Sequence, residues 1–152
     1  MKKILFAASE CVPFIKTGGL ADVVGSLPKE FDKRYFDCRV ILPKYQCMRE
    51  EFKNKLEYIS HFYMDIGNKN QYVGILKTEY EGITFYFIDN EYYFNGPKPY
   101  GDIAYDIEKF AYFSKAALCA LPLLDFRPDI IHCHDWQTGL VPVYLHDSFQ
   151  EN

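Results

Sequence analysis

The chain has 152 residues, of which 49% are apolar and 25% are charged, and this size and balance are typical of one globular domain. Its formal net charge of −4 disfavours nucleic acid as a partner, because binding to a phosphate backbone requires clustered cations. No apolar run approaches the ~20 residues that cross a bilayer, so we expect no membrane association.

The first 43 residues predict a strand, a helix and a second strand. The segment KKILFAAS is apolar without alternation, which is typical of a central strand buried on both faces. A helix is expected to begin near Leu20, because apolar side chains recur on one helical face at Leu20, Val23, Val24, Leu27 and Phe31. The apolar run CRVILP, closed by Pro43, then completes a βαβ unit.

The five cysteines are scattered, odd in number and without a C-x-x-C pair. This pattern favours reduced thiols in the cytoplasm over a disulfide framework or a structural zinc site. One of them, Cys11, follows two lysines and a short apolar stretch, as in a lipoprotein signal. That stretch is shorter than the ~7–15 residues of a signal core, and Glu10 stands where a small residue is needed, so a buried strand is predicted instead.

The middle of the chain is rich in β-forming residues. EYISHFYMDI, QYVGILKTEY and ITFYFID are separated by the turn signals GNKN and EG, which predict hairpins. We interpret this region as an antiparallel insertion or an edge extension of the sheet. The segment NEYYFNGPKPYGD, with glycines, prolines and aromatic residues but no period, predicts an exposed loop.

The last third predicts a helix, a strand and a helix. Asp102 or Asp106 can cap a helix that runs to about Leu121, with an inner face made by Ile107, Phe110, Phe113, Ala117 and Leu121. PDIIHCHDW predicts a second buried strand, and TGLVPVYLHDSF a closing helix that tolerates Pro142 near its start. The whole chain is therefore expected to form one α/β, Rossmann-like domain over residues 1–152, with a mostly parallel sheet and a hairpin-rich middle.

The segment KTGGLAD places a cation and two glycines ahead of the first helix. Gly18 and Gly19 allow backbone N–H groups to approach a ligand, and the helix N-terminus and Lys16 add positive charge, so a phosphate is one interpretation. A tight turn beside a solvated lysine is the other, and the spacing leaves both open. Asp22 has two interpretations as well, as an acid that complements the helix dipole or as a contact for sugar hydroxyls.

The segment HCHDW carries the second group of polar side chains. His132 and His134 point to the same face of a strand and could share a metal ion, but the sequence offers no further cluster of ligands, so no metal or other cofactor is expected. We expect His132 to pack in the strand, and His134 and Asp135 to be exposed in a crevice. Trp136 is expected to pack at the rim of that crevice and Gln137 to form hydrogen bonds there.

These two segments follow strands that are predicted to be parallel. In open α/β sheets, ligands bind outside the carboxyl ends of the strands, so Lys16 and Asp135 are expected to face one crevice. Tyr100, in GPKPYGD, can stack on a sugar ring or cover the core.

Four segments carry a family resemblance: SECVPFIKTGGLADVVGSLPKEF, RVILPKY, YFIDNEYYF and PDIIHCHDWQTGLVPVYL. They resemble the opening half-domain of bacterial glycogen synthases and plant starch synthases, which are retaining glucosyltransferases of the GT-B fold. The similarity runs over residues 1–145, and the K-T-G-G-L and H-D-W motifs are its most diagnostic parts. The resemblance implies transfer of glucose from ADP-glucose to the non-reducing end of an α-1,4-glucan such as glycogen.

The resemblance also implies roles for individual residues. In the family, the motif lysine lies against the phosphate and sugar of the donor, the two glycines approach the same group, and the acid at the helix start contacts the donor. The implied residues that bind ADP-glucose are Lys16, Thr17, Gly18, Gly19, Asp22, Tyr100 and Gln137. The implied catalytic residues are Asp135 and His134.

The chain departs from the family pattern in its length. Such enzymes have two Rossmann-like domains, with the nucleotide mainly on the second, and the 152 residues stop before that second domain. The resemblance therefore implies an N-terminal, acceptor-side domain whose partner is its own C-terminal domain, and which is inactive alone. The alternative is a non-catalytic module that binds a sugar phosphate or a glucan.

Overall fold

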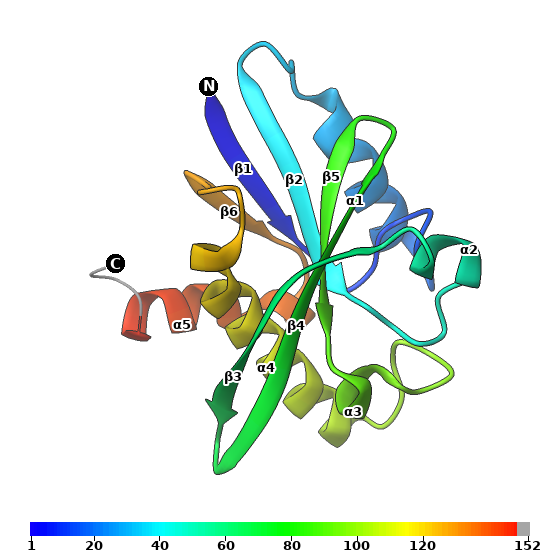
Figure 1. Ribbon diagram of the computed structural model, residues 1–152, viewed down its shortest axis with the longest axis vertical. Helices are drawn as coiled ribbons and strands as arrows, with labels where there is room; N and C mark the ends of the chain where they lie inside the picture. Colours follow the sequence, from blue (N-terminus) through cyan, green and yellow to red (C-terminus); the bar gives the residue numbers. More distant parts are fainter. Residues whose placement is uncertain (149–152) are drawn as a thin grey trace.

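The computed structural model describes residues 1–148, which form one six-stranded sheet with helices around it (Figure 1). The strands lie in the order β3-β4-β5-β2-β1-β6, with bounds β1 Lys2–Ala7, β2 Phe36–Pro43, β3 Glu57–Ile66, β4 Lys69–Tyr80, β5 Ile83–Asp89 and β6 Ile130–Cys133. The helices are α1 Gly19–Glu30, α2 Glu50–Lys53, α3 Glu91–Phe94, α4 Ile103–Ala120 and α5 Leu140–Ser148, with short 3₁₀ turns at Leu121–Leu123 and Trp136–Thr138. Within the described residues, no helix is both long and apolar enough to cross a membrane.

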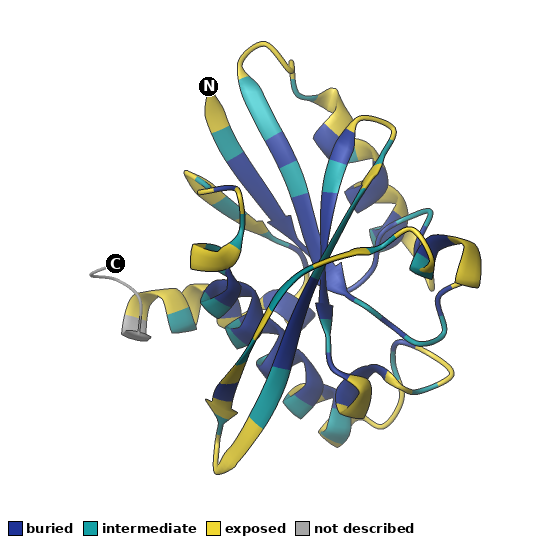
Figure 2. Ribbon diagram, in the orientation of Figure 1, coloured by how far each residue is buried: buried dark blue, intermediate teal, exposed yellow. Residues whose placement is uncertain are grey.

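The half of the sheet that contains β5, β2, β1 and β6 is parallel throughout. Leu5 of β1 pairs with Arg39 of β2 on one side and with Ile131 of β6 on the other. The apolar run of β1 is buried, as expected for a strand covered on both faces (Figure 2). The predicted Rossmann-like α/β class is therefore confirmed.

The other half of the sheet is an antiparallel hairpin of β3 and β4 that continues into β5. Glu81 and Gly82, in the turn between β4 and β5, both have positive φ, which is the backbone conformation that a type I′ hairpin turn requires. The predicted hairpins are confirmed. Strand β5 belongs to both halves, because it is antiparallel to β4 but parallel to β2.

The two crossover connections lie on opposite faces of the sheet. Phe14, in the loop before α1, packs edge-on against Phe85 and Phe87 of β5 at centroid distances of 4.8 and 5.1 Å. Tyr86, between them in sequence, points to the other face and bonds Asp125 in the connection that follows α4. The chain therefore covers one face of the sheet with α1 and the other with α4, as in doubly wound folds.

Some predicted inner-face residues are exposed. Val23 is 50% exposed, whereas the other predicted apolar positions of α1, Leu20, Val24, Leu27 and Phe31, pack in or against the core. Gly25 faces the loop before the helix, where a Cβ would meet the side chain of Val12 at 2.3 Å, so the close contact between loop and helix requires glycine there. Ile107 is 57% exposed, because the charged residues Asp106 and Lys109 occupy the buried face of α4.

Two further expectations were wrong in part. The segment 130–133 is a parallel strand but lies at the edge of the sheet, with Ile130 47% exposed, because among residues 1–148 only β1 pairs with it. The segment 90–102 is not simply an exposed loop, since it contains α3, in which Tyr93 and Phe94 are buried.

The predicted Asp102 cap of α4 is present, and the helix α5 tolerates Pro142 as its third residue, but the expected end of that helix at Phe149 lies outside the described residues.

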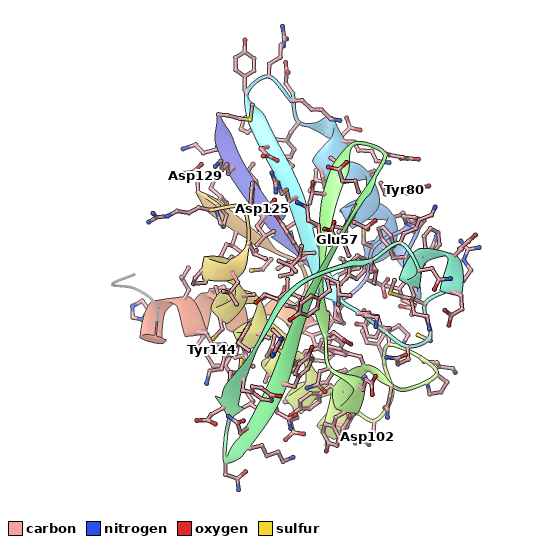
Figure 3. The ribbon with its side chains drawn as sticks, in the orientation of Figure 1. Glu57, Tyr80, Asp102, Asp125, Asp129 and Tyr144 are labelled. Atoms are coloured by element: carbon pink, nitrogen blue, oxygen red, sulfur yellow. The ribbon has the colours of Figure 1, made fainter. Side chains whose placement is uncertain are left out.

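Asp125, labelled in Figure 3, accepts hydrogen bonds from Lys77, at 2.6 Å, and from Tyr86, and forms an ion pair with Arg39. The bond from Lys77, followed by that from Tyr86, lowers the pKa of Asp125 from 3.8 to about 2. A carboxyl group with a lowered folded-state pKa stabilises the fold above its ordinary pKa and loses that contribution as the pH falls through the folded-state value.

We therefore expect Asp125→Asn to be less stable than the parent at pH 7, by under about 1 kcal/mol because solvent screens this half-exposed carboxylate. The difference in the free energy of unfolding should shrink as the pH falls from 4 towards 2. Urea unfolding at a series of pH values measures it. A difference that is the same at pH 3 and pH 7 would contradict the expectation.

Candidate functional site at the carboxyl ends of β1 and β6

Strands β1 and β6 lie side by side and end together, with Ala7 opposite Cys133. The N–H of His134 donates to the carbonyl of Ala7 over 3.2 Å, so the two loops that follow these strands begin in contact. The β1 loop leads to α1, whereas the β6 loop leads to α5, which packs on α4 at the other face. The expectation that both loops leave one edge of the sheet is confirmed, and this edge is the topological switch point at which such folds bind ligands.

The loop between β1 and α1 is fixed from its first residues. Ser9 and Glu10 are buried, at 0% and 1% exposure, and the Tyr45 hydroxyl donates to the carbonyl of Ser9 over 2.7 Å. Farther along, the N–H of Val12 donates to the carbonyl of Ala21 in α1 over 3.1 Å. The loop is therefore packed against the helix that it precedes.

The carboxylate of Glu10 is the centre of the hydrogen-bond network at this edge. It accepts bonds from the Thr17 hydroxyl, from the Gly18 N–H over 3.1 Å and from the Tyr100 hydroxyl over 2.9 Å. Sequence reasoning missed this residue, because Glu10 drew attention only as an obstacle to a signal peptide. An acid directly after a buried apolar strand was the available signal.

Tyr100 is bonded to the β1 loop and packs on α4. Its hydroxyl bonds Ser9 Oγ over 2.6 Å as well as Glu10, and its ring packs against Phe110 at 5.7 Å. Burial, together with the bond to Glu10 and the nearby charge of Asp135, raises the pKa of Tyr100. The ring thus covers the core, while the hydroxyl belongs to a hydrogen-bond network that also includes Glu10, Thr17 and Gly18.

The segment that carries Tyr100 is held by two buried charged residues of α4. Lys109 Nζ donates to the carbonyl of Pro99 over 2.8 Å, and Asp106 accepts from the N–H of Gly101 over 2.9 Å. The two side chains also form an ion pair at 3.3 Å, and both are at most 5% exposed. Tyr100 is therefore fixed on both sides by its neighbours in the chain.

The predicted anion site lies at the start of α1. Lys16 forms an ion pair with Asp22 at 2.7 Å, and both side chains are more than half exposed. Neither Gly18 nor Gly19 has a positive φ, and a Cβ at either would meet no atom within 4 Å. The fold therefore does not need glycine at these positions, so a tight turn does not explain them. The Gly18 N–H is already bonded to Glu10, so the N–H groups that α1 can offer to a ligand begin at Gly19.

Asp135 is exposed at the start of the β6 loop and has a strained backbone, with φ 60° and ψ −175°, a conformation that is nearly restricted to glycine. The Thr138 hydroxyl holds this turn, because it accepts from the N–H of His134 and donates to the carbonyl of His134, both over 2.8 Å. The side chain of Asp135 is thereby presented at the same edge as Tyr100.

The burial of the two histidines is the reverse of what the sequence suggested, although both rings pack on Phe6. His134 is buried at 9% exposure and stacks against Phe6, whereas His132 is exposed at the edge of the sheet. His132 is exposed because β6 is an edge strand. His134 lies in the turn after β6, which Thr138 closes through two hydrogen bonds. Burial and the neighbouring His132 lower the pKa of His134. As expected, the two rings share a face, with 3.0 Å between His132 Nδ1 and His134 Nε2, but within residues 1–148 no third side chain completes a group that could hold a metal.

Trp136 and Gln137 differ in their environments. Trp136 is 51% exposed and packs edge-on against Phe110 at 5.6 Å, which agrees with a rim position. Gln137 is buried at 8% exposure, and its Oε1 has no hydrogen-bond partner. The expected hydrogen bond of this oxygen is therefore not made within the described residues.

Comparison with known proteins agrees with this geometry. A family model described as the starch synthase catalytic domain matches residues 3–152. The chain is 68% identical over its whole length to a glycogen synthase of Lachnoclostridium phytofermentans, of which it covers 32%. It is 50% identical over 99% of its length to a glycogen synthase of Anoxybacillus flavithermus, of which it covers 31%.

Among solved structures, the fold is similar to the catalytic domain of starch synthase IV from Arabidopsis thaliana bound to ADP and acarbose, with a TM-score of 0.78 and 32% identity. That similarity covers 97% of this chain and 30% of the Arabidopsis chain. The chain thus spans about a third of the length of the curated relatives that it matches.

Proposed function

The chain belongs to the family of starch synthase catalytic domains, and on this premise we propose that it forms the N-terminal, acceptor-side domain of a glycogen synthase. Such an enzyme transfers glucose from ADP-glucose to the non-reducing end of an α-1,4-glucan with retention at the anomeric carbon. The starch synthase structure bound to ADP and acarbose supports a nucleotide and a glucan as the classes of ligand.

One observation carries the proposal: the loops after β1 and β6 meet at one edge of the sheet, and Tyr100 is bonded to the first of them. A sugar nucleotide placed there has a cation and a helix N-terminus at the Lys16 end. It has an exposed carboxylate at the Asp135 end. These are the two kinds of charge that the reaction requires.

The chemistry assigns a role to each end. Breaking the bond between glucose and diphosphate builds negative charge on the departing phosphate, which Lys16 and the N-terminus of α1 stabilise. Positive charge builds at the anomeric carbon, and Asp135 either orients sugar hydroxyls or stabilises that charge. Thr17, Gly19 and Asp22 contact the donor in this scheme, and Asp22 exchanges its ion pair with Lys16 for a bond to the substrate.

His134 and Gln137 have smaller roles in this scheme. Because His134 is buried, it supports the turn of Asp135 from behind instead of touching the substrate. The unpaired Oε1 of Gln137 is available to a ligand hydroxyl only if the turn at Trp136–Thr138 moves. Since the chain spans about a third of its relatives, we infer that turnover requires residues outside this shared third and that the 152 residues alone are inactive.

The proposal is tested by joining residues 1–152 to the remaining two thirds of a close relative and measuring transfer of labelled glucose. We expect the joined enzyme to incorporate labelled glucose from ADP-glucose into glycogen, and an α-1,4-specific hydrolase to release that label. We expect no incorporation by the 152-residue chain alone. Binding of ADP or a maltooligosaccharide without any transfer would favour the non-catalytic module. Transfer by the 152-residue chain alone would refute the division of labour proposed here.

A further inference from the structure

We propose that Glu10 is a positioning residue, which holds residues 16–19 and Tyr100 in one fixed arrangement at the donor site. This inference rests on the proposed function for the identity of the ligand, but the arrangement itself is a property of this chain. Glu10 does not touch the substrate in this proposal. It acts through the groups that it binds.

The first argument is the division of bonds between the two carboxylate oxygens. Oε1 accepts from the Gly18 N–H, whereas Oε2 accepts from both the Thr17 and the Tyr100 hydroxyls. Thr17 and Gly18 are seven and eight residues away along the chain, but Tyr100 is 90 residues away. Glu10 therefore ties together two segments that the sheet topology brings to one edge but does not itself align.

The second argument is electrostatic. A buried acid is costly unless hydrogen-bond donors satisfy it, and three donors converge on Glu10. Its charge also lies beside the place proposed for an anionic diphosphate, where a negative charge weakens binding. The negative charge alone therefore gives no advantage at this position. The role of Glu10 depends instead on a side chain that is long enough, and has two oxygens, to bond both segments.

The third argument is that the described residues form few other bonds to the same segment. Gly18 begins α1 without a side-chain cap, and Lys16 is bonded only to the exposed Asp22 among the described residues. Without Glu10, residues 16–19 would be held mainly by the chain on either side. A misplacement of about 1 Å at a reacting group costs about 10²-fold in rate.

The test separates reach from charge with two variants of the full-length synthase. Glu10→Gln removes the charge but keeps the reach, since its oxygen can accept from Gly18 while its amide group donates to the Thr17 and Tyr100 oxygens. Glu10→Asp keeps the charge but is one methylene shorter and cannot reach both segments. The first readout is hydrogen exchange at the Gly18 amide without substrate, and the second is kcat/KM for ADP-glucose.

We expect Glu10→Asp to raise exchange at Gly18 about tenfold or more and to lower kcat/KM about 10²-fold. Glu10→Gln should keep exchange near that of the parent and lose less than about tenfold in kcat/KM. The matched control is Asp125→Ala, which removes a carboxylate with three partners on the other face of the sheet and should change neither readout.

Impairment by Glu10→Gln with full activity of Glu10→Asp would overturn the proposal, because charge and not reach would then matter. Unchanged exchange at Gly18 in Glu10→Asp would overturn it as well. Exchange is measured without substrate, so it does not depend on the proposed function. If the parent enzyme transfers no glucose but exchange at Gly18 still rises in Glu10→Asp, the proposed function is rejected and the positioning role is supported.

Discussion

Replacing Lys16 by alanine in the full-length synthase is expected to lower kcat/KM for ADP-glucose by about 10²–10³-fold. Removing one preorganised group that stabilises developing charge typically costs that much. Lys16 is the cation at the start of α1, and its side chain is 52% exposed, so its loss should remove little packing. The free energy of unfolding should therefore change by less than about 1 kcal/mol, because the ion pair with Asp22 is a surface pair.

The same helix supplies a matched control. Lys29, in the last turn of α1, is also an exposed lysine paired with an acid, Glu81, but it lies at the opposite end of the helix. Lys29→Ala should leave kcat/KM within about twofold of the parent. Initial rates over a range of ADP-glucose concentrations, together with urea unfolding of both variants, give the comparison. If Lys16→Ala and Lys29→Ala have equal kinetics, Lys16 is only a solvated surface residue.

The parts of the fold that the sequence predicted are those in which local pattern and tertiary environment agree. The runs KKILFAAS and CRVILP became parallel strands, because strands buried on both faces need continuous apolar residues. The hairpins formed at GNKN and EG, because those turns impose the positive φ that glycine accepts. The meeting of the loops after β1 and β6 followed from parallel pairing alone.

The errors arose where burial depends on elements distant in sequence. Whether His132 or His134 is buried depends on β6 being an edge strand, which no local pattern shows. The apolar stripe of α1 was wrong only at Val23, which is 50% exposed, whereas Leu20, Val24, Leu27 and Phe31 pack in or against the core. Glu10 was missed for the same reason, because Tyr100, whose hydroxyl donates to its carboxylate, lies 90 residues away in the sequence.

The buried pair of Asp106 and Lys109 is the clearest case of a feature hidden from apolar periodicity, and it also gives the largest expected effect on stability. Lys109→Met should destabilise the fold by about 3–5 kcal/mol, because it leaves Asp106 buried without its cation. It also removes the bond to the carbonyl of Pro99, so the segment that carries Tyr100 loses one of its two anchors. We expect the loss of stability to be accompanied by lower affinity for ADP-glucose.

Urea unfolding measures this effect, and α4 offers the control. Glu108, on the exposed side of the same helix, pairs with Lys69 at 3.0 Å, with 37% and 45% of the two side chains exposed. Lys69→Met should lower the free energy of unfolding by no more than about 1 kcal/mol, because solvent screens this exposed ion pair. The double variant Asp106→Leu with Lys109→Met should be more stable than Lys109→Met alone, since no unpaired charge then remains buried. If Lys109→Met costs as little as Lys69→Met, the pair is not what holds this end of α4. The fixed position of Tyr100 would then depend mainly on its bonds to Glu10 and Ser9 and on the bond from the Gly101 N–H to Asp106.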